Sequence, residues 1–230
     1  MPTHLHHEIE RLKKRILSMG AEVEEAVRKS VDALLNRDPK LAQQVIDYDE
    51  ALDDLEVEIE EECLKILALH QPVAVDLRYV VAVMKMNNDL ERIGDLAVDI
   101  SERAIYLAGH PQPGLRLDIR SMADTAQLML KNSLDAMVNS DTALAHRVRA
   151  ADDEVDEINR QMFVLIHDYI RQHPEYVAEA IHLLSAARHL ERIADQVTNI
   201  AEDVIYMVEG EIVRHQPEVF DDERSRDNAE

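Results

Sequence analysis

The sequence predicts an all-α protein built as two tandem, pseudo-symmetric three-helix bundles. The composition is typical of helices, because the 230 residues include only five Gly, seven Pro, two Phe and no Trp. The stretch 89–100 returns as 189–200 without an insertion, which indicates an internal duplication. Within each copy, apolar residues recur every three or four positions and form one stripe of a helix. The two copies therefore predict two helical halves of similar design.

The first half, residues 1–110, is predicted to contain three helices. Each helix is predicted from apolar residues within it that recur at three- and four-residue spacing. Asp38 followed by Pro39 marks the second start, because Asp is a favoured N-cap and proline suits the first helical position. Gly109 is a stop signal for the third helix. The expected helices cover about residues 9–36, 38–69 and 73–108.

The second half, residues 111–210, repeats this plan. Residues 144–157 align with residues 41–54 at an offset of 103, so the duplication extends beyond the stretches 89–100 and 189–200 to whole halves. The expected helices are one around residues 122–138, one from the turn at 139–141 to Gln172, and one from after Pro174 to Gly210. Residues 211–230 are polar and charged with little periodicity, and we expect a frayed or disordered tail there.

Net charge and composition restrict the partners. The formal charge of −22 argues against nucleic acid, whose phosphates require a basic face, and favours cations or basic protein surfaces. The chain has no run of eighteen apolar residues and no apolar secretory signal core, and Cys63 is its single cysteine. We therefore predict a cytoplasmic protein that reaches membranes only through partner proteins.

Carboxylates at four-residue spacing form two matching sets. Asp53 lies 17 residues before the turn at 70–72 and Glu91 lies 19 after it, so the two are level on antiparallel helices. In the second half, Asp156 and Glu191 each lie 17 residues from the turn at 173–174, so they are level as well. Asp99 or Asn199, with Glu102 or Glu202, could extend the sets. The sets are Asp49, Asp53, Glu91 and Asp95 in the first half, and Asp152, Asp156, Glu191 and Asp195 in the second.

A cation is expected at each set. Two carboxylates about 5 Å apart repel by roughly 3 kcal/mol at an effective dielectric constant near 20, against a net stability of about 5–15 kcal/mol. Ligand sets made only of oxygen suit hard ions such as Mg²⁺, Mn²⁺, Ca²⁺ or iron, and each site could hold more than one ion. The alternative is that both sets are solvated helix faces of an acidic protein.

Three motifs give the chain a resemblance to the PhoU family of phosphate-uptake regulators. Residues 71–78 read Gln-Pro-Val-Ala-Val-Asp-Leu-Arg, and Leu-Glu-Arg-Ile-x-Asp occurs at 90–95 and 190–195. The resemblance spans residues 8 to about 210. It implies a PhoU-like fold and a cytoplasmic, non-enzymatic regulator, most simply a homodimer. Such a protein would restrain the phosphate-starvation response by contacting the ATPase of the phosphate transporter and a phosphate-sensing histidine kinase.

The resemblance also implies metal binding. The family's Glu/Asp-x-x-x-Asp motifs bind multinuclear metal clusters in some members, and here they fall on the two carboxylate sets. Asp76 and Arg78 of the turn motif could belong to a partner surface, although an acid at a helix start and a solvated Arg78 would explain them equally well. The second half departs from the family pattern in its turn at residues 173–177. It also has Asn199 where the first half has Asp99, and this second difference would make its metal site weaker or differently populated.

Two alternative functions are a di-metal enzyme and a metal-binding or buffering protein. A di-metal oxidase or hydrolase would draw its ligands from two Glu-x-x-His motifs, and the chain has only Glu179-x-x-His182. It also lacks nucleophile motifs and glycine-rich phosphate loops, so we do not expect an enzyme. A metal-binding or buffering protein stays open, because the acidic stripes alone are compatible with it.

Overall fold

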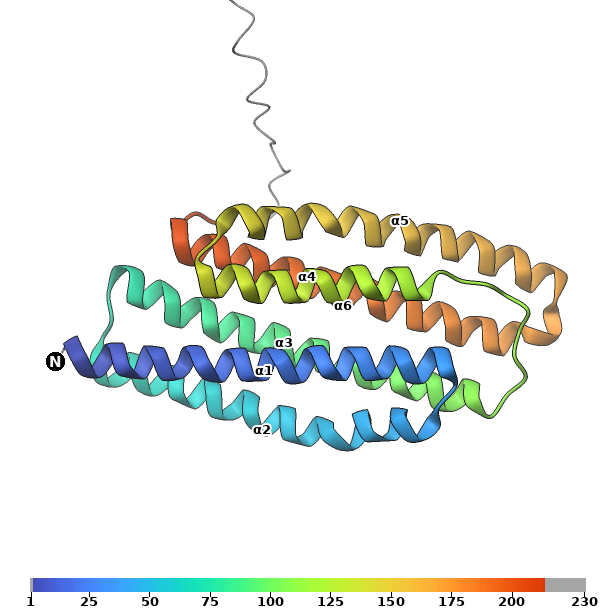
Figure 1. The fold of residues 1–230 in the computed structure, drawn as a ribbon, viewed down its shortest axis with the longest axis horizontal. Coiled ribbons are helices and arrows are strands. Elements are labelled where there is room, and N and C mark those ends of the chain that lie inside the picture. Colours follow the sequence, from blue (N-terminus) through green and yellow to red (C-terminus); the bar gives the residue numbers. More distant parts are fainter. Residues whose placement is uncertain (1, 214–230) are drawn as a thin grey trace, which may run out of the picture.

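The computed structural model describes residues 2–213, and the regular structure within them is entirely helical (Figure 1). Helices α1–α3 form one three-helix bundle and α4–α6 a second that lies alongside it, so the predicted fold class is confirmed. Residues 214–230, most of the predicted tail, lie outside the described residues. The elements are α1 (Pro2–Asn36), α2 (Pro39–His70), α3 (Ala74–Ala108), α4 (Ile119–Asn139), α5 (Thr142–Gln172), the 3-10 turn η1 (Pro174–Tyr176) and α6 (Val177–Glu209).

The helix starts use the caps that the sequence predicts. Asp38 accepts hydrogen bonds from the backbone N–H groups of Lys40 at 3.0 Å and Leu41 at 3.1 Å, and Pro39 is the first residue of α2. Asp141 caps α5 in the same way by accepting from Leu144 N–H at 2.9 Å. The two halves therefore repeat the local chemistry of their second helix as well as its sequence.

Helix α4 begins at Ile119, three residues before the expected position 122, and helix α6 begins at Val177, later than the expected start directly after Pro174. Helix α4 has 21 residues, whereas the other five α-helices have 31 to 35, because residues 109–118 connect the halves and the helix starts only at the Asp118 cap. Helix α6 begins at Val177, since Pro174–Tyr176 form a separate 3-10 turn first. The second half is thus a shortened copy of the first.

The core is apolar and runs through both halves. Leu90 and Ile93 of the repeated stretch 89–100 are fully buried, as are their copies Leu190 and Ile193. Helices α3 and α6, which carry the two copies, pack against one another, and α1 packs against α4. The duplicated helices therefore hold the two bundles together.

Polar contacts between α3 and α6 follow an antiparallel register. Lys85 Nζ lies 2.9 Å from Asp203 Oδ1 at one end of the contact, and the Tyr106 ring stacks on the His182 ring at 3.7 Å at the other end. Helices α3 and α6 are therefore antiparallel. Because positions 85 and 203 correspond to positions 185 and 103 of the duplication, this register is what a pseudo-twofold axis between the halves requires.

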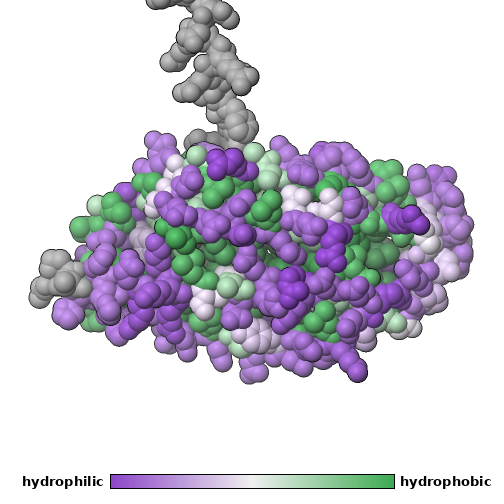
Figure 2. All heavy atoms as spheres, in the orientation of Figure 1, coloured by the Kyte–Doolittle hydropathy of each residue, from purple (hydrophilic) through white to green (hydrophobic). Residues whose placement is uncertain are grey.

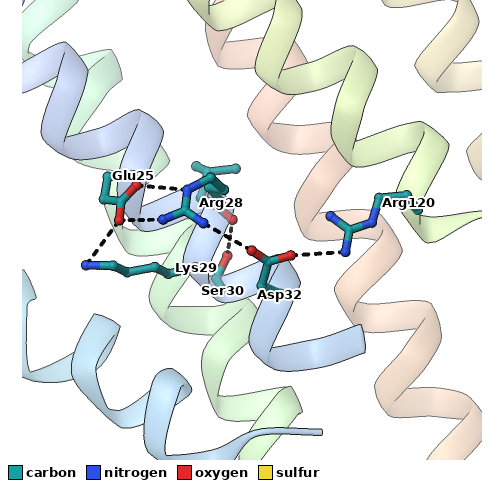
Figure 3. Close-up of polar contacts among 7 residues, drawn as sticks. Glu25, Arg28, Lys29, Ser30, Asp32 and Arg120 are labelled. Carbon is teal, nitrogen blue, oxygen red and sulfur yellow. Dashed lines mark hydrogen bonds and ion pairs between the residues drawn. The ribbon is translucent and has the colours of Figure 1, made fainter. Parts of the chain in front are cut away.

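A second polar contact joins α1 to α4 (Figure 3). Arg28 pairs with Glu25 and with Asp32 on its own helix, at 2.6 Å and 3.2 Å. The other oxygen of Asp32 lies 3.0 Å from Arg120 Nη2 on α4. One carboxylate therefore links an arginine of each half. Such exposed pairs contribute about 0–1 kcal/mol each and serve mainly to fix the orientation.

Breaking the Lys85–Asp203 pair is expected to destabilise the protein. The Asp203 side chain is only 2% exposed, so replacing Lys85 by alanine removes a cation that lies 2.9 Å from a buried carboxylate. We expect the free energy of unfolding to fall by about 2–3 kcal/mol, measured by urea denaturation. Lys40→Ala, at an exposed lysine of the α2 start, is the control and should change it by less than about 0.5 kcal/mol. Equal losses in the two variants would contradict this role for the pair.

The surface is largely hydrophilic, with hydrophobic areas scattered between charged side chains (Figure 2). Among residues 2–213, no helix combines the length and the apolar character that a membrane crossing would need.

Candidate metal centres

Helices α2 and α3 bring the first carboxylate set to one side of their contact. Burial raises the pKa of Asp49, and the charges of Asp53 and Asp95 raise it further. Burial is also the main cause of the raised pKa values of Glu91 and Asp95, and Asp53 adds to both. Carboxylates on α2 and α3 therefore act on one another across the helix pair, as their level positions predict.

Gly94 allows this close approach. A Cβ atom at Gly94 would lie 3.3 Å from Leu52 Cδ1 and 3.9 Å from Asp49 Oδ1. The Asp49 carboxylate thus lies beside the α3 backbone, between the positions of Glu91 and Asp95. The second half has Ala194, fully buried, at the matching position.

Helices α5 and α6 hold the second set, whose carboxylates are likewise affected by burial and by one another's charges. Burial raises the pKa of Asp152 to about 7, and the charges of Asp195, Asp156, Asp153 and Glu191 contribute. The pKa values of Glu191 and Asp195 are raised as well, first by burial and then by neighbouring carboxylates of the set. Ionising this set therefore costs free energy that a bound cation would offset.

The donor chemistry of both sets fits a hard metal ion. All eight members of the two sets offer carboxylate oxygens, which Mg²⁺, Mn²⁺, Ca²⁺ and iron accept. Within the described part of the chain, however, no three His, Cys, Asp or Glu side chains gather closely enough to hold an ion. The helices place the carboxylates level, and side-chain rotation would have to bring their oxygens together. Metal binding at these sets stays a prediction.

Asp99 and Asn199, two of the candidate extensions of the sets, lie in different surroundings. Asp99 raises the pKa of Asp95, so its charge reaches the first set. The same carboxylate lies 3.9 Å from Arg103 Nη2 and 3.5 Å from Nδ1 of His189 on α6. Asp99 therefore connects the first set to the contact between the halves. Asn199 is half-buried and has no charge with which to do the same.

Sequence reasoning missed Glu56 and Arg149 as neighbours of the sets, whereas Glu202 was expected as a possible extension. Glu56 lies one turn beyond Asp53, and its charge helps raise the pKa of Glu91. Its three-residue spacing from Asp53 was a signal that could have included it. Glu202 is 11% exposed and lies 3.5 Å from Arg149, which is 9% exposed. The pairing with Arg149 was not expected from the first half, where Ile46 occupies the matching position.

The two candidate partner-surface residues lie at the start of α3. Asp76 is exposed in the first turn of the helix. Arg78 is half-buried and its Nε donates a hydrogen bond to the Met207 carbonyl at 3.4 Å. The arginine therefore contacts the end of α6, and the carboxylate faces solvent.

Comparison with known proteins gives consistent matches over nearly the whole chain. The family model described as the PhoU domain matches residues 16–104 and again 119–204. A curated relative from Aquifex aeolicus, the phosphate-specific transport system accessory protein PhoU homolog, is 42% identical over 212 residues, which cover 92% of this chain and 96% of the relative. The corresponding protein of Serratia marcescens is 34% identical over 208 residues, covering 90% and 86%.

Solved structures agree with these matches. The crystal structure of PhoU from Pseudomonas aeruginosa superposes with a TM-score of 0.87 at 37% identity, covering 90% of this chain and 99% of that one. The structure of the phosphate transport system regulatory protein PhoU from Streptococcus pneumoniae gives a TM-score of 0.81 at 27% identity, covering 91% and 99%.

Proposed function

The chain belongs to the PhoU family, and we propose that it is an accessory and regulatory protein of phosphate-specific transport, without enzymatic activity of its own. The observation that carries this proposal is the match to the PhoU domain in both halves. The relatives from Aquifex aeolicus and Streptococcus pneumoniae are named as an accessory and a regulatory protein of phosphate transport, and this chain covers 96% and 99% of their lengths. The chain therefore spans nearly the whole length of those relatives.

The finer proposal names the partners. In this proposal the protein is a cytoplasmic homodimer that contacts the ATPase subunit of a phosphate transporter and a phosphate-sensing histidine kinase, and so restrains the phosphate-starvation response. The net charge of −22 supports protein partners over nucleic acid. The absence of a membrane-crossing helix within residues 2–213 is compatible with membrane association through these partners.

We further propose that each carboxylate set holds one or more metal ions. The support is the oxygen-only donor set on level helix positions and the raised pKa values in both halves. A bound ion would supply the positive charge that keeps all carboxylates of a set ionised. The carboxylates themselves would then tie α2 to α3 and α5 to α6. The fixed helix pairs would present a rigid surface to a partner.

Co-purification tests the partner proposal. The tagged full-length protein should retain the transporter ATPase and the histidine kinase from detergent-solubilised membranes of its own organism, and should not retain promoter DNA or protein-free lipid vesicles. A metal-buffering protein, the alternative function, would exchange metal but retain neither membrane partner. Direct binding of promoter DNA at physiological salt would also contradict the proposal.

A further inference from the structure

The C-terminal half of α5 carries an exposed apolar group on its outer side. Phe163, Val164 and Leu165 are 57%, 57% and 51% exposed. Hydrophobic surface is visible along this part of α5 in the space-filling view (Figures 1 and 2). Exposed apolar residues also occur elsewhere, as in the turn at 73–77, so exposure alone does not identify an interaction site. The charges around the group on α5 are what distinguish it.

A stripe of exposed residues runs along this outer side of α5. Met162 and Ile166 are 1% exposed and face the core, and Val164 lies about 200° round the helix from each of them. Positions three, four and seven residues from Val164 share its side of the helix. All six of these positions are exposed. We call the following residues the α5 stripe: Glu157, Arg160, Gln161, Val164, His167, Asp168 and Arg171.

The charges of the α5 stripe are opposite in sign at equal distances from Val164. Arg160 and Asp168 each lie four residues from Val164, one on either side. Glu157 and Arg171 each lie seven residues from it, again one on either side. Each acid of the stripe is therefore matched by an arginine at the same distance beyond the centre. These four charges sum to zero, in a chain whose formal charge is −22.

This pattern is complementary to a second copy of itself in the antiparallel direction. When two antiparallel copies of α5 meet at Val164, residues at equal distances on opposite sides of Val164 are level. Arg160 then faces Asp168 of the second copy, and Glu157 faces Arg171 of the second copy. The twofold axis repeats both pairs, so four ion pairs flank an apolar centre. A parallel contact would place each charge against itself.

The first half has no such pattern at the matching place. At the offset of 103, the α5 stripe corresponds to a stripe of α2 that has Glu61 in the position of Val164. An antiparallel contact centred on Glu61 would bring two like charges together. Asp54 and Ala68 occupy the outermost positions, so the opposite charges are missing there as well. The self-complementary pattern is therefore a property of α5 and not of the duplication.

Contacts along the helix hold the polar side chains of the stripe in place. Arg160 Nη2 lies 3.1 Å from Glu157 Oε2, and Gln161 Nε2 donates to Glu157 Oε1 at 2.8 Å. His167 Nδ1 lies 3.4 Å from Asp168 Oδ1. Side chains that are already ordered lose less conformational freedom when a partner binds. The stripe is thus partly organised for a contact before the contact forms.

The length of the stripe sets the strength of the contact. Glu157 and Arg171 are 14 positions apart, which corresponds to about 21 Å of helix. One helix seam of this length is expected to bury less than the roughly 800 Å² per partner of a standard interface. A shallow hollow of about 470 Å³ beside Val164 gives room for a side chain of the second copy. We therefore expect a reversible dimer with a dissociation constant in the micromolar range.

We propose that the α5 stripe is the contact between two copies of the chain, joined antiparallel about a twofold axis at Val164. This inference rests on the homodimer of the proposed function and deepens it by naming the surface and the direction of the contact. The role in phosphate transport does not depend on it.

Mixing two charge variants tests the pairing. Arg160→Glu with Arg171→Glu makes the charges of the stripe all acidic, and Glu157→Arg with Asp168→Arg makes them all basic. Each variant alone is expected to dimerise at least about tenfold more weakly than the unchanged protein, because like charges meet in the contact. An equimolar mixture should recover the dimer, since the two stripes complement each other. Sedimentation equilibrium of the purified full-length proteins measures the dissociation constants.

The control for the acidic variant is an equal change of charge outside the stripe. Lys14→Glu combined with Lys40→Glu replaces two exposed lysines, one on α1 and one on α2. At physiological salt, where charges outside the contact are largely screened, this control should dimerise like the unchanged protein. Equal weakening in the control and in the acidic variant would show that net charge, and not the stripe, governs association. Circular dichroism should show the same helix content in all the variants.

Disulfide formation tests the direction of the contact. Val164→Cys places a thiol at the twofold axis, so oxidation should link two copies. Glu157→Cys, at another exposed position of the stripe, is the control, because two such thiols lie about 21 Å apart in the antiparallel contact and should not link. Links at both positions would show a parallel contact and overturn the proposal. The native Cys63 is fully buried and does not compete.

The outcomes separate the surface from the proposed function. If the unchanged protein stays monomeric over the micromolar range, as it would if residues 214–230 or a different protein covered the stripe, the α5 contact and the homodimer both fail. Co-purification with the transporter ATPase then still decides the regulatory role. If dimers form and both charge variants dimerise like the unchanged protein, the homodimer stands and the α5 stripe is not its surface. Growth to species larger than a dimer would refute the closed twofold contact.

Discussion

Replacing Asp95 and Asp195 together by alanine is expected to remove most of the bound metal. Each residue belongs to one carboxylate set and lies close enough to its neighbours across the helix pair to be affected by their charges. Loss of one ligand of a hard ion, and of one negative charge of four, weakens an all-carboxylate site in two ways. We expect the metal content after loading with Mn²⁺ and dialysis to fall to less than about a tenth, measured by elemental analysis.

The control for this experiment is an equal loss of charge outside the sets. Asp54→Ala combined with Asp124→Ala removes two exposed carboxylates from α2 and α4 and should leave the metal content unchanged. A full metal complement in the Asp95/Asp195 variant would show that the sets are solvated surface charge. Loss of metal in both double variants would show that the acidic surface attracts ions without defined sites.

The two halves should respond differently to single substitutions. Asp99 reaches the first set and also lies near Arg103 and His189, whereas the second half has the neutral Asn199. With one fewer carboxylate available, the second set depends more on each remaining one. This difference could be read from the sequence, but the contact of Asp99 with α6 could not.

Helix boundaries and level positions were predictable because they depend on local chemistry. An aspartate directly before a helix caps it by accepting from the free backbone N–H groups of the first turn, as Asp38 and Asp141 do. A tight turn sets the register of the residues on either side. The same argument placed Asp53 level with Glu91. Each step needed only nearby residues and the geometry of antiparallel helices.

The contacts between the halves depend on how two bundles rotate against each other, and the sequence did not supply that angle. No sequence feature near Lys85 predicts that its partner is Asp203, 118 positions away. The strained φ of Ala74 is equally invisible, because alanine is an ordinary helix residue and the sequence carries no glycine there. Such features arise from packing and not from local preference.

The stability of the metal-free protein is expected to fall as the pH rises from about 4 to 7. Burial and four neighbouring carboxylates raise the pKa of Asp152 in the folded protein to about 7, from the 3.8 of an exposed aspartate. Between these values the folded chain holds a proton that the unfolded chain has lost, so the free energy of unfolding decreases with pH in this window and levels off above it. Asp49, Glu91, Glu191 and Asp195, also raised, contribute with the same sign.

Asp152→Asn is the variant that isolates this effect. Raising the pKa of a carboxyl from 3.8 to about 7 corresponds to about 4 kcal/mol for a fully buried group, and solvent on the exposed side of Asp152 reduces this to about 1–2 kcal/mol. The asparagine variant should therefore be more stable than the unchanged protein by that amount near pH 7.5, and the two should converge near pH 4. Urea denaturation in the presence of a chelator measures both.

Glu154→Gln, at an exposed position of α5, is the matched control and should follow the unchanged protein at every pH. Identical pH profiles for the Asp152→Asn variant and the unchanged protein would refute the assignment to this carboxyl. Saturating Mn²⁺ should reverse the order near pH 7.5, because the ion stabilises the ionised carboxylates of the unchanged protein and the variant has lost one of them. The same substitution is thus expected to stabilise the second bundle without metal and to destabilise it, relative to the unchanged protein, when metal is present.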